Sequence, residues 1–383
     1  MQNGSGSFRL KKLIKQVGSP LLDALGVFDR SIERLRADSS AWTILMYHRV
    51  IRDARDDPFE MGMCVRLPHF EQQIAYLRTH FNVTSISEVA ERLHRGEALA
   101  PGTVSITFDD GYLDNLTVAA PVLERHGMPW SLYVTTGGID SGASFWWDRV
   151  IRAVALTPVR RLDLEKLPAA FGGGALSLTR SHRRTSLLRL LDVLWSLPIE
   201  VTLACVSQVE EALIQGLAAD CGPQAPRLSV AQLRELVARG GVEIGAHSVR
   251  HPNLAAQPIA EVVHEMHESR RCLESLLDQA IPGFVYPGGR MSGEVIEQAR
   301  SAGFRYALST ESRINDLPCD LMQLGRIGMP DSSAADFRRA LHNQMSRLPA
   351  GGRSGGPVQC FSHSSAAPLP SRPGKAGDMS PTW

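Results

Sequence analysis

Residues 104–111 read Val-Ser-Ile-Thr-Phe-Asp-Asp-Gly, an apolar run that ends in two adjacent carboxylates and a glycine. The apolar run predicts a buried β-strand, and the glycine allows the chain to turn sharply behind the acids. Taken alone, an Asp-Asp-Gly string is more often a solvated turn than a catalytic site. Its meaning therefore depends on what surrounds it in the fold.

Apolar runs alternate with helical segments on both sides of this stretch, from residue 43 onward. Such alternation is typical of repeated βα units that build a parallel sheet or barrel. Ser85 and Ser229 are placed to cap two of the helices. We predict an α/β fold, a distorted (β/α) barrel of about seven parallel strands. The strands are expected at residues 43–47, 82–84, 104–108, 130–134, 242–246, 284–286 and 306–309.

The alternation breaks between about residues 140 and 227, where helical segments predominate and strand candidates are few. We therefore predict a helical insertion within a domain that spans residues 43–345. Residues 346–383 are rich in Gly, Pro, Ser and Ala, a composition that buries little apolar surface and predicts a flexible tail.

Residues 1–42 form a separate N-terminal region with a basic amphipathic helix, in which apolar residues from Phe8 to Leu25 recur at helical spacing. The basic residues beside them are Arg9, Lys11, Lys12 and Lys15. Such a helix either packs on the domain, the commoner outcome, or lies on a membrane surface. Neither a signal sequence nor a membrane-spanning run is visible, so we expect a cytoplasmic protein, with peripheral membrane contact as the open alternative.

Charge and cysteine content narrow the range of partners. Lys and Arg number 41 against 40 Asp and Glu, a balance that gives no electrostatic reason to expect a nucleic-acid partner. The six cysteines lie far apart without a Cys-x-x-Cys pair, which argues against a thiolate zinc site and a dense disulfide framework. A reducing compartment is the simpler interpretation.

Four groups of polar residues each follow a predicted strand. In a βα barrel the carboxyl ends of the strands converge on one face, where active sites are found, so we expect these groups to meet in one pocket. The groups are Tyr47-His48, Asp109-Asp110, His247 to His251, and Tyr286-Pro287-Gly288.

His247 and His251 are four residues apart, so that on one helical turn both imidazoles point to the same side. An isolated pair with this spacing is as often structural as functional. With an added carboxylate, it forms a set of two histidines and one Asp that leaves coordination positions open for water and substrate.

At these positions the chain resembles the polysaccharide deacetylase family, carbohydrate esterase family 4, whose fold is also called the NodB-homology domain. Thr107 to Gly111 resembles the family's first motif, His247 to Pro252 its second, and Phe284 to Gly289 its third. The likeness spans roughly residues 43 to 330, interrupted by the insertion. Phe145-Trp146-Trp147-Asp148 is also similar to members that carry an insertion at this place.

The resemblance implies a role for each of these residues. The metal ligands would be Asp110, His247 and His251, and the catalytic base would be Asp109. Zinc is the implied metal, although Co²⁺, Ni²⁺, Fe²⁺ and Mn²⁺ also suit such a ligand set. The implied reaction is the metal-dependent hydrolysis of N-acetyl groups on amino sugars of a polysaccharide or glycan.

The third motif would form the substrate and oxyanion loop, with Tyr286, Pro287 and Gly288. The Gly288 N–H is the expected oxyanion donor. Val285 stands where the family often has an arginine that orients the base, and Arg290 and Arg326 are the candidates to take its place.

The leaving nitrogen needs a proton donor, for which two histidines are candidates. His48 ends the first predicted strand and can reach the pocket, and some relatives carry a similar Tyr-His there. His363 is the nearest match to the family's histidine motif, but it lies in the tail. We expect His48 to act with Asp109, and a core or capping role is its structural alternative.

Two other functions are compatible with the same residues. A non-catalytic carbohydrate-binding protein could keep the fold without turnover, although it would have no need for Asp109. An O-acetyl esterase would use the same site, so substrate tests alone separate it. The residues leave the glycan open among chitin oligomers, peptidoglycan, an exopolysaccharide and a lipid-linked intermediate.

Overall fold

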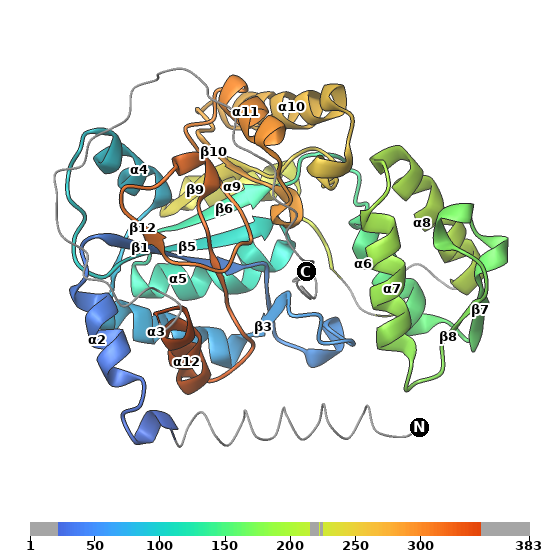
Figure 1. Ribbon diagram of the computed structural model, residues 1–383, viewed down its shortest axis with the longest axis horizontal. Coiled ribbons are helices and arrows are strands. Elements are labelled where there is room, and N and C mark those ends of the chain that lie inside the picture. Colours follow the sequence, from blue (N-terminus) through green and yellow to red (C-terminus); the bar gives the residue numbers. More distant parts are fainter. Residues whose placement is uncertain (1–21, 215–221, 223–224, 346–383) are drawn as a thin grey trace, which may run out of the picture.

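The computed structural model describes residues 22–214, 222 and 225–345 (Figure 1). Residues 1–21, which hold most of the predicted basic helix, lie outside this description. The predicted tail, with His363, lies outside it as well.

A curled sheet of mostly parallel strands forms the centre of the molecule (Figure 1). Its strands are ordered β11-β10-β9-β6-β5-β1-β12, so from β1 to β11 the neighbours follow chain order, as expected of successive βα units. The parallel strands are β1 (Ala41–Tyr47), β5 (Thr103–Asp110), β6 (Trp130–Val134), β9 (Val242–Ala246), β10 (Gly283–Val285) and β11 (Tyr306–Leu308). The short β4 (Asn82–Val83) and β13 (Ile327–Gly328) pair parallel with β5 and β1, and β12 (Asn315–Asp316) pairs antiparallel with β1.

All seven predicted strands are present, as β1, β4, β5, β6, β9, β10 and β11, which confirms the predicted fold class. β1 and β5 are buried along their whole length, which explains why they appear in the sequence as continuous apolar runs. The prediction missed β12 and β13, which have two residues each and do not lie in an apolar run.

Helices cover the outside of the sheet, with α10 and α11 above it and α3 and α12 below it in the view of Figure 1. The predicted caps are present, since the hydroxyls of Ser85 and Ser229 each accept a backbone N–H in the first turn of α4 and α9. Before the insertion the helices are α2 (Asp29–Ala37), α3 (Leu67–His80), α4 (Ile86–His94) and α5 (Ala120–His126), the last preceded by a π-helical turn at Asn115–Ala119. After it they are α9 (Val230–Arg239), α10 (Ile259–Leu277), α11 (Gly293–Ser301) and α12 (Ala334–Met345).

The predicted insertion forms a mainly helical lobe beside the sheet (Figure 1). Its helices share a hydrophobic core that is separate from the core under the sheet. The lobe contains α6 (Trp146–Leu156), α7 (Arg183–Trp195) and α8 (Ile199–Ile214), with a hairpin of β7 (Arg161–Asp163) and β8 (Ala175–Ser177). A small two-stranded sheet of β2 (Arg49–Ile51) and β3 (Cys64–Arg66) follows β1.

The alternation of side chains along β5 decides what the barrel interior holds. Ile106 and Phe108 belong to the core between sheet and helices. Thr107 and Asp109 instead accept hydrogen bonds from the buried Arg326. Because successive residues of a strand face opposite sides, Asp109 is directed into the barrel together with this arginine.

Candidate functional site

Asp109 and Asp110 end β5, and the backbone turns here so that both carboxylates line one cavity. Asp110 has a φ angle of 76° and Gly111 one of 91°, both in the left-handed region. A residue with a side chain occupies that region at a cost of about 1–3 kcal/mol, and such strain is concentrated at functional sites. A strand that simply continued would direct the two carboxylates to opposite faces.

His247 and His251 come together in a loop, and the helical turn expected from their spacing is absent from residues 247–251. Ser248 and His251 have φ angles of 63° and 58°, outside the right-handed helical region. The Ser248 hydroxyl accepts the His251 N–H at 3.0 Å and holds this turn. The ring centroids of His247 and His251 are 4.7 Å apart. The spacing thus predicted the proximity of the rings but was wrong about the backbone that produces it.

Asp110, His247 and His251 form a cluster that suits a metal ion. One ligand atom from each residue lies within 4.8 Å of the others. The Nε2 atoms of His247 and His251 are 3.5 and 3.7 Å from Oδ1 of Asp110. Both carboxylate oxygens of Asp110 are buried without a hydrogen-bond partner in the described residues. Leaving a buried polar atom unpaired costs about 1–3 kcal/mol or more, so these residues fit a cation.

A backbone carbonyl fixes the orientation of His247. The ring bonds through Nδ1 to the Val285 carbonyl oxygen at 2.8 Å, so Nδ1 carries the hydrogen and Nε2 is left as a ligand atom. Histidine ligands in metal sites are commonly oriented by such a bond from the other ring nitrogen. The contact uses the main chain of Val285 and therefore does not depend on which side chain stands at this position.

Burial sets the protonation of the cluster. It lowers the pKa of His247 to about 4 and the pKa of His251 well below its usual range, with His247 adding to the second shift. Both imidazoles are therefore neutral at pH 7, the form in which histidine binds metals. Burial, with the neighbouring Asp109, also raises the pKa of Asp110. A cation would reverse this last shift, because an opposite charge favours the ionised carboxylate.

Asp109 differs from Asp110 because a fully buried arginine pairs with it. Arg326 donates from its two terminal nitrogens to the two carboxylate oxygens of Asp109, both at 2.7 Å. Burial alone would raise the pKa of Asp109, but the charge and hydrogen bonds of Arg326 outweigh it and hold this pKa at about 2. Of the two arginines proposed to orient the base, Arg326 makes the contact and Arg290 is exposed.

His48 lies on another side of Asp109, with its Nε2 3.9 Å from Oδ2 of that carboxylate. It lines the same cavity as the metal cluster. The Asn115 side chain donates to the His48 carbonyl at 2.8 Å, which fixes the backbone just after β1. Burial lowers the pKa of His48, and the nearby Asp109 opposes this shift.

Of the third motif, Gly288 lines the cavity, while Tyr286 and Pro287 are buried behind it. The Tyr286 hydroxyl donates to the carbonyl of Met322 at 3.0 Å, so this side chain faces the core. Gly288 has a φ angle of 55°, and a Cβ at this position would lie 2.4 Å from a ring carbon of Trp195. Glycine is required here because the loop and the insertion approach so closely.

The cavity around these residues has a volume of about 40 Å³ and apolar walls. The insertion supplies Trp147, Ile151, Leu191 and Trp195, and the barrel end supplies Met46, Met61 and Met63. The rings of Trp147 and Trp195 pack against His251, with centroid distances of 4.4 and 5.4 Å. Most of these residues were missed in the sequence, where their spacing is that of any buried helix face.

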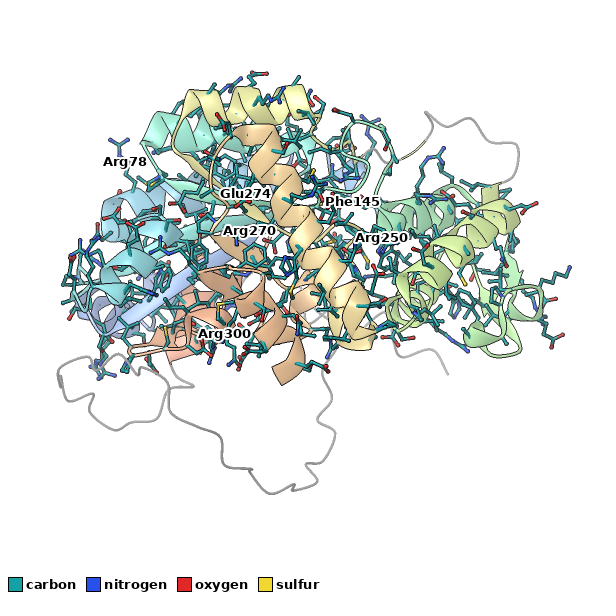
Figure 2. The ribbon with its side chains drawn as sticks, turned by 90° about the horizontal axis from the view of Figure 1, so that it is seen from above. Arg78, Phe145, Arg250, Arg270, Glu274 and Arg300 are labelled. Carbon is teal, nitrogen blue, oxygen red and sulfur yellow. The ribbon has the colours of Figure 1, made fainter. Side chains whose placement is uncertain are left out.

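A buried carboxylate on α10 holds the loop that carries the two histidines. Glu265 accepts the N–H groups of Val249 and Arg250 at 2.7 and 2.9 Å with one oxygen, and Nε of Arg250 at 2.9 Å with the other. Arg250 also pairs with Glu261 of α10 and with Glu200 of α8. Figure 2 shows Arg250 where α10 approaches the insertion. These contacts tie the histidine loop to α10 and to α8 of the insertion. The sequence did not predict them, because polar residues on a helix are usually solvated.

Replacing Arg326 by Met should lower the free energy of unfolding by about 3–5 kcal/mol, because Asp109 would stay buried without its partner. Chemical denaturation measures this change. The exposed Arg290→Met should stay within about 0.5 kcal/mol of the wild type. Equal losses in the two variants would contradict a specific role for the buried pair.

Glu265→Gln should weaken zinc binding to the metal-free protein by roughly 10-fold, because the histidine loop loses its charged anchor. Competition with a chelating dye measures the affinity. Glu268→Gln on the same helix, where Glu268 pairs with the exposed Arg271, serves as the matched control. An unchanged zinc affinity in Glu265→Gln would show that the loop holds its shape without the clamp.

The chain is similar to known proteins over the region of these motifs. Residues 184–307 match the family model described as Polysaccharide deacetylase, and this segment contains His247, His251 and the third motif. The Bacillus subtilis (strain 168) protein YxkH, named provisionally as a polysaccharide deacetylase, is 20% identical over 292 residues. That alignment covers 73% of this chain and 71% of the relative.

Two solved structures share the fold. The deacetylase PplD of Streptococcus pyogenes superposes with a TM-score of 0.54 at 19% identity, covering 80% of this chain and 99% of PplD. IcaB from Ammonifex degensii gives a TM-score of 0.51 at 19% identity, covering 80% of this chain and 97% of IcaB. The family-model match and the relative agree with the predicted resemblance to the polysaccharide deacetylases, and the solved structures share the fold with its curled parallel sheet.

Proposed function

We propose that this protein is a metal-dependent hydrolase that removes N-acetyl groups from the amino sugars of a glycan. One observation carries the proposal. A single small pocket contains both a cluster that suits a metal ion, Asp110, His247 and His251, and a second carboxylate, Asp109, whose low pKa keeps it ionised. The match of residues 184–307 to the deacetylase family model supports the reaction, and the contrast between the two adjacent aspartates supports the division of roles.

Asp110, His247 and His251 are the proposed ligands of a divalent cation, which would supply Lewis acidity toward water and the acetamide carbonyl. Two imidazoles and one carboxylate leave coordination positions open, as in catalytic zinc sites. We propose zinc, although Co²⁺, Ni²⁺, Fe²⁺ and Mn²⁺ accept the same donors.

Asp109 is the proposed base that accepts the proton of the attacking water. Its pKa of about 2 keeps it ionised at neutral pH, and the two bonds from Arg326 hold the plane of the carboxylate. His48, 3.9 Å away, is the proposed donor to the leaving nitrogen. Because burial lowers its pKa and leaves the imidazole neutral, the proton that it delivers would be the one that Asp109 takes from water. The Gly288 N–H is the proposed donor to the oxyanion.

The size of the cavity supports acetyl as the group removed. A volume of about 40 Å³ is far below the ~300–1,000 Å³ of sites that enclose a small molecule, so the pocket does not enclose a sugar ring. The apolar side chains of Trp147, Ile151 and Leu191 suit a methyl group at the end of such a pocket. The sugar that carries the acetamide would therefore lie outside the mouth of the cavity.

Acetate release from N-acetylglucosamine oligomers and from peptidoglycan should depend on metal and on Asp109. Chelation should abolish release, and added zinc or cobalt should restore it. Asp109→Asn should lower kcat by roughly 100- to 10,000-fold with zinc still bound, because the base is lost and the ligands remain.

The exposed Asp192→Asn serves as the matched control and should leave kcat unchanged. A zinc-loaded, folded wild type that releases no acetate from any glycan would contradict the proposal and favour a binding protein. Release from O-acetylated sugars alone would favour an esterase.

We also propose a cytoplasmic location with peripheral contact to a membrane surface. Leu22 and Leu25, which continue the predicted amphipathic stripe, are 42% and 69% exposed, whereas Ile32 and Leu35 of α2 are buried. Exposed apolar residues beside a basic segment are typical of an interfacial helix. The described helices include none with the length and apolar character of a membrane span.

Reversing the charge of Lys11, Lys12 and Lys15 to Glu should weaken binding to anionic phosphatidylglycerol vesicles by roughly 100-fold, at about 1 kcal/mol for each lysine near the surface. Vesicle co-sedimentation measures the partition. Lys166→Glu, in the insertion, should leave it unchanged. Equal binding by the triple variant and the wild type would remove the membrane proposal and leave the deacetylase proposal intact.

A further inference from the structure

We infer that a second cavity beside the metal pocket binds a neutral sugar unit of the glycan, next to the unit that loses its acetyl group. The inference rests on the proposed deacetylase function. This cavity has a volume of about 410 Å³, within the ~300–1,000 Å³ range of small-molecule sites. The metal pocket, at about 40 Å³, does not enclose a sugar ring, so the rest of a glycan needs a further surface to bind.

The second cavity lies between the β2–β3 segment and helix α6 of the insertion. Met61, Met63 and Ile151 line both cavities and form the partition between them. Tyr112 lines the second cavity two residues after Asp110, just past the carboxyl end of β5. The cavity therefore lies at the catalytic end of the barrel. Flexible methionine side chains in the partition can adapt to a ligand that spans both cavities.

A chain of hydrogen bonds crosses from one cavity to the other. The Trp147 indole N–H donates to the Tyr112 hydroxyl at 2.9 Å, and that hydroxyl donates to Oδ2 of Asp148 at 2.9 Å. Trp147 packs against His251 in the metal pocket, whereas Tyr112 and Asp148 line the second cavity. Adjacent residues of α6 thus serve the two cavities, which makes them parts of one binding surface.

The charges around the second cavity favour a neutral, hydroxyl-rich ligand. An anion would meet four carboxylates, and a cation would meet three guanidinium groups. A hydroxyl group can donate to the carboxylates and accept from the guanidinium groups. The charged side chains among the described lining residues are Arg49, Arg149, Arg152, Asp56, Asp57, Asp148 and Glu210.

The protein holds some of these groups in place and leaves others for a ligand. Arg149 is fixed by its ion pair with Glu210 of α8. Tyr112 occupies one oxygen of Asp148, and the other oxygen has no hydrogen bond to any described residue. Burial raises the pKa of Asp148 to about 7, so near neutral pH this carboxyl group can either donate to or accept from a sugar hydroxyl.

Substrate length tests the inference in the zinc-loaded protein. The wild type should have a kcat/KM for the N-acetylglucosamine tetramer at least about 10-fold above that for the monomer, because several hydrogen bonds are added. Ala143→Trp fills the cavity from an exposed loop and should remove most of this ratio. Ala98→Trp, in the exposed loop before β5, is the matched control and should keep it. A ratio that survives in Ala143→Trp overturns the inference.

Direct binding separates this inference from the proposed function. Calorimetry of the tetramer with metal-free protein should give roughly 10-fold weaker binding to Ala143→Trp than to the wild type or Ala98→Trp. That result supports the site even if no variant releases acetate. Asp148→Asn keeps the cavity volume and should weaken binding similarly, which covers the case of a misfolded Trp variant. Absence of tetramer binding to the wild type, or equal binding to all variants, contradicts the site whatever the catalytic result.

Discussion

The buried ion pair between Arg326 and Asp109 is the contact on which the site depends. It joins the end of β5 to a residue 217 positions later in the chain, inside the barrel, where neither charge is stable alone. The pair also separates the roles of two adjacent acids, because it keeps Asp109 ionised while Asp110 stays without a counter-charge. Two neighbouring carboxylates without this arginine would compete for one proton.

The backbone conformation also shapes the site. Left-handed residues at Asp110 and His251 bring ligand atoms from separate strand ends toward one point. Such conformations persist where the surroundings over-determine them. Here the surroundings include the clamp from Glu265 and the carbonyl of Val285, both of which lie outside the cavity. Contacts outside the cavity therefore hold the cluster in shape.

Features that depend on residues close together in the chain could be predicted from the sequence. β1 and β5 are buried along their length, so their apolar runs and the acids that follow them could be predicted. The choice between Arg290 and Arg326 could not, because it depends on how β13 pairs with β1. The contacts of Trp195 and Glu265 with the site could not be predicted for a similar reason. They form only when the insertion and α10 pack around the histidine loop. The left-handed φ angles of Asp110, Ser248 and His251 could not be predicted either, because the spacing of residues along the chain carries no information about them.

The insertion has a hydrophobic core of its own, yet it forms one wall of the pocket. All proposed chemical groups come from the barrel, while the insertion contributes the apolar side chains of Trp147, Ile151, Leu191 and Trp195. The proposed chemical groups and this wall of the pocket are thus encoded in separate stretches of the gene. Mutations could remodel the lobe and redirect the protein to another glycan without altering the chemistry, provided that the contact between Arg250 and Glu200 is kept.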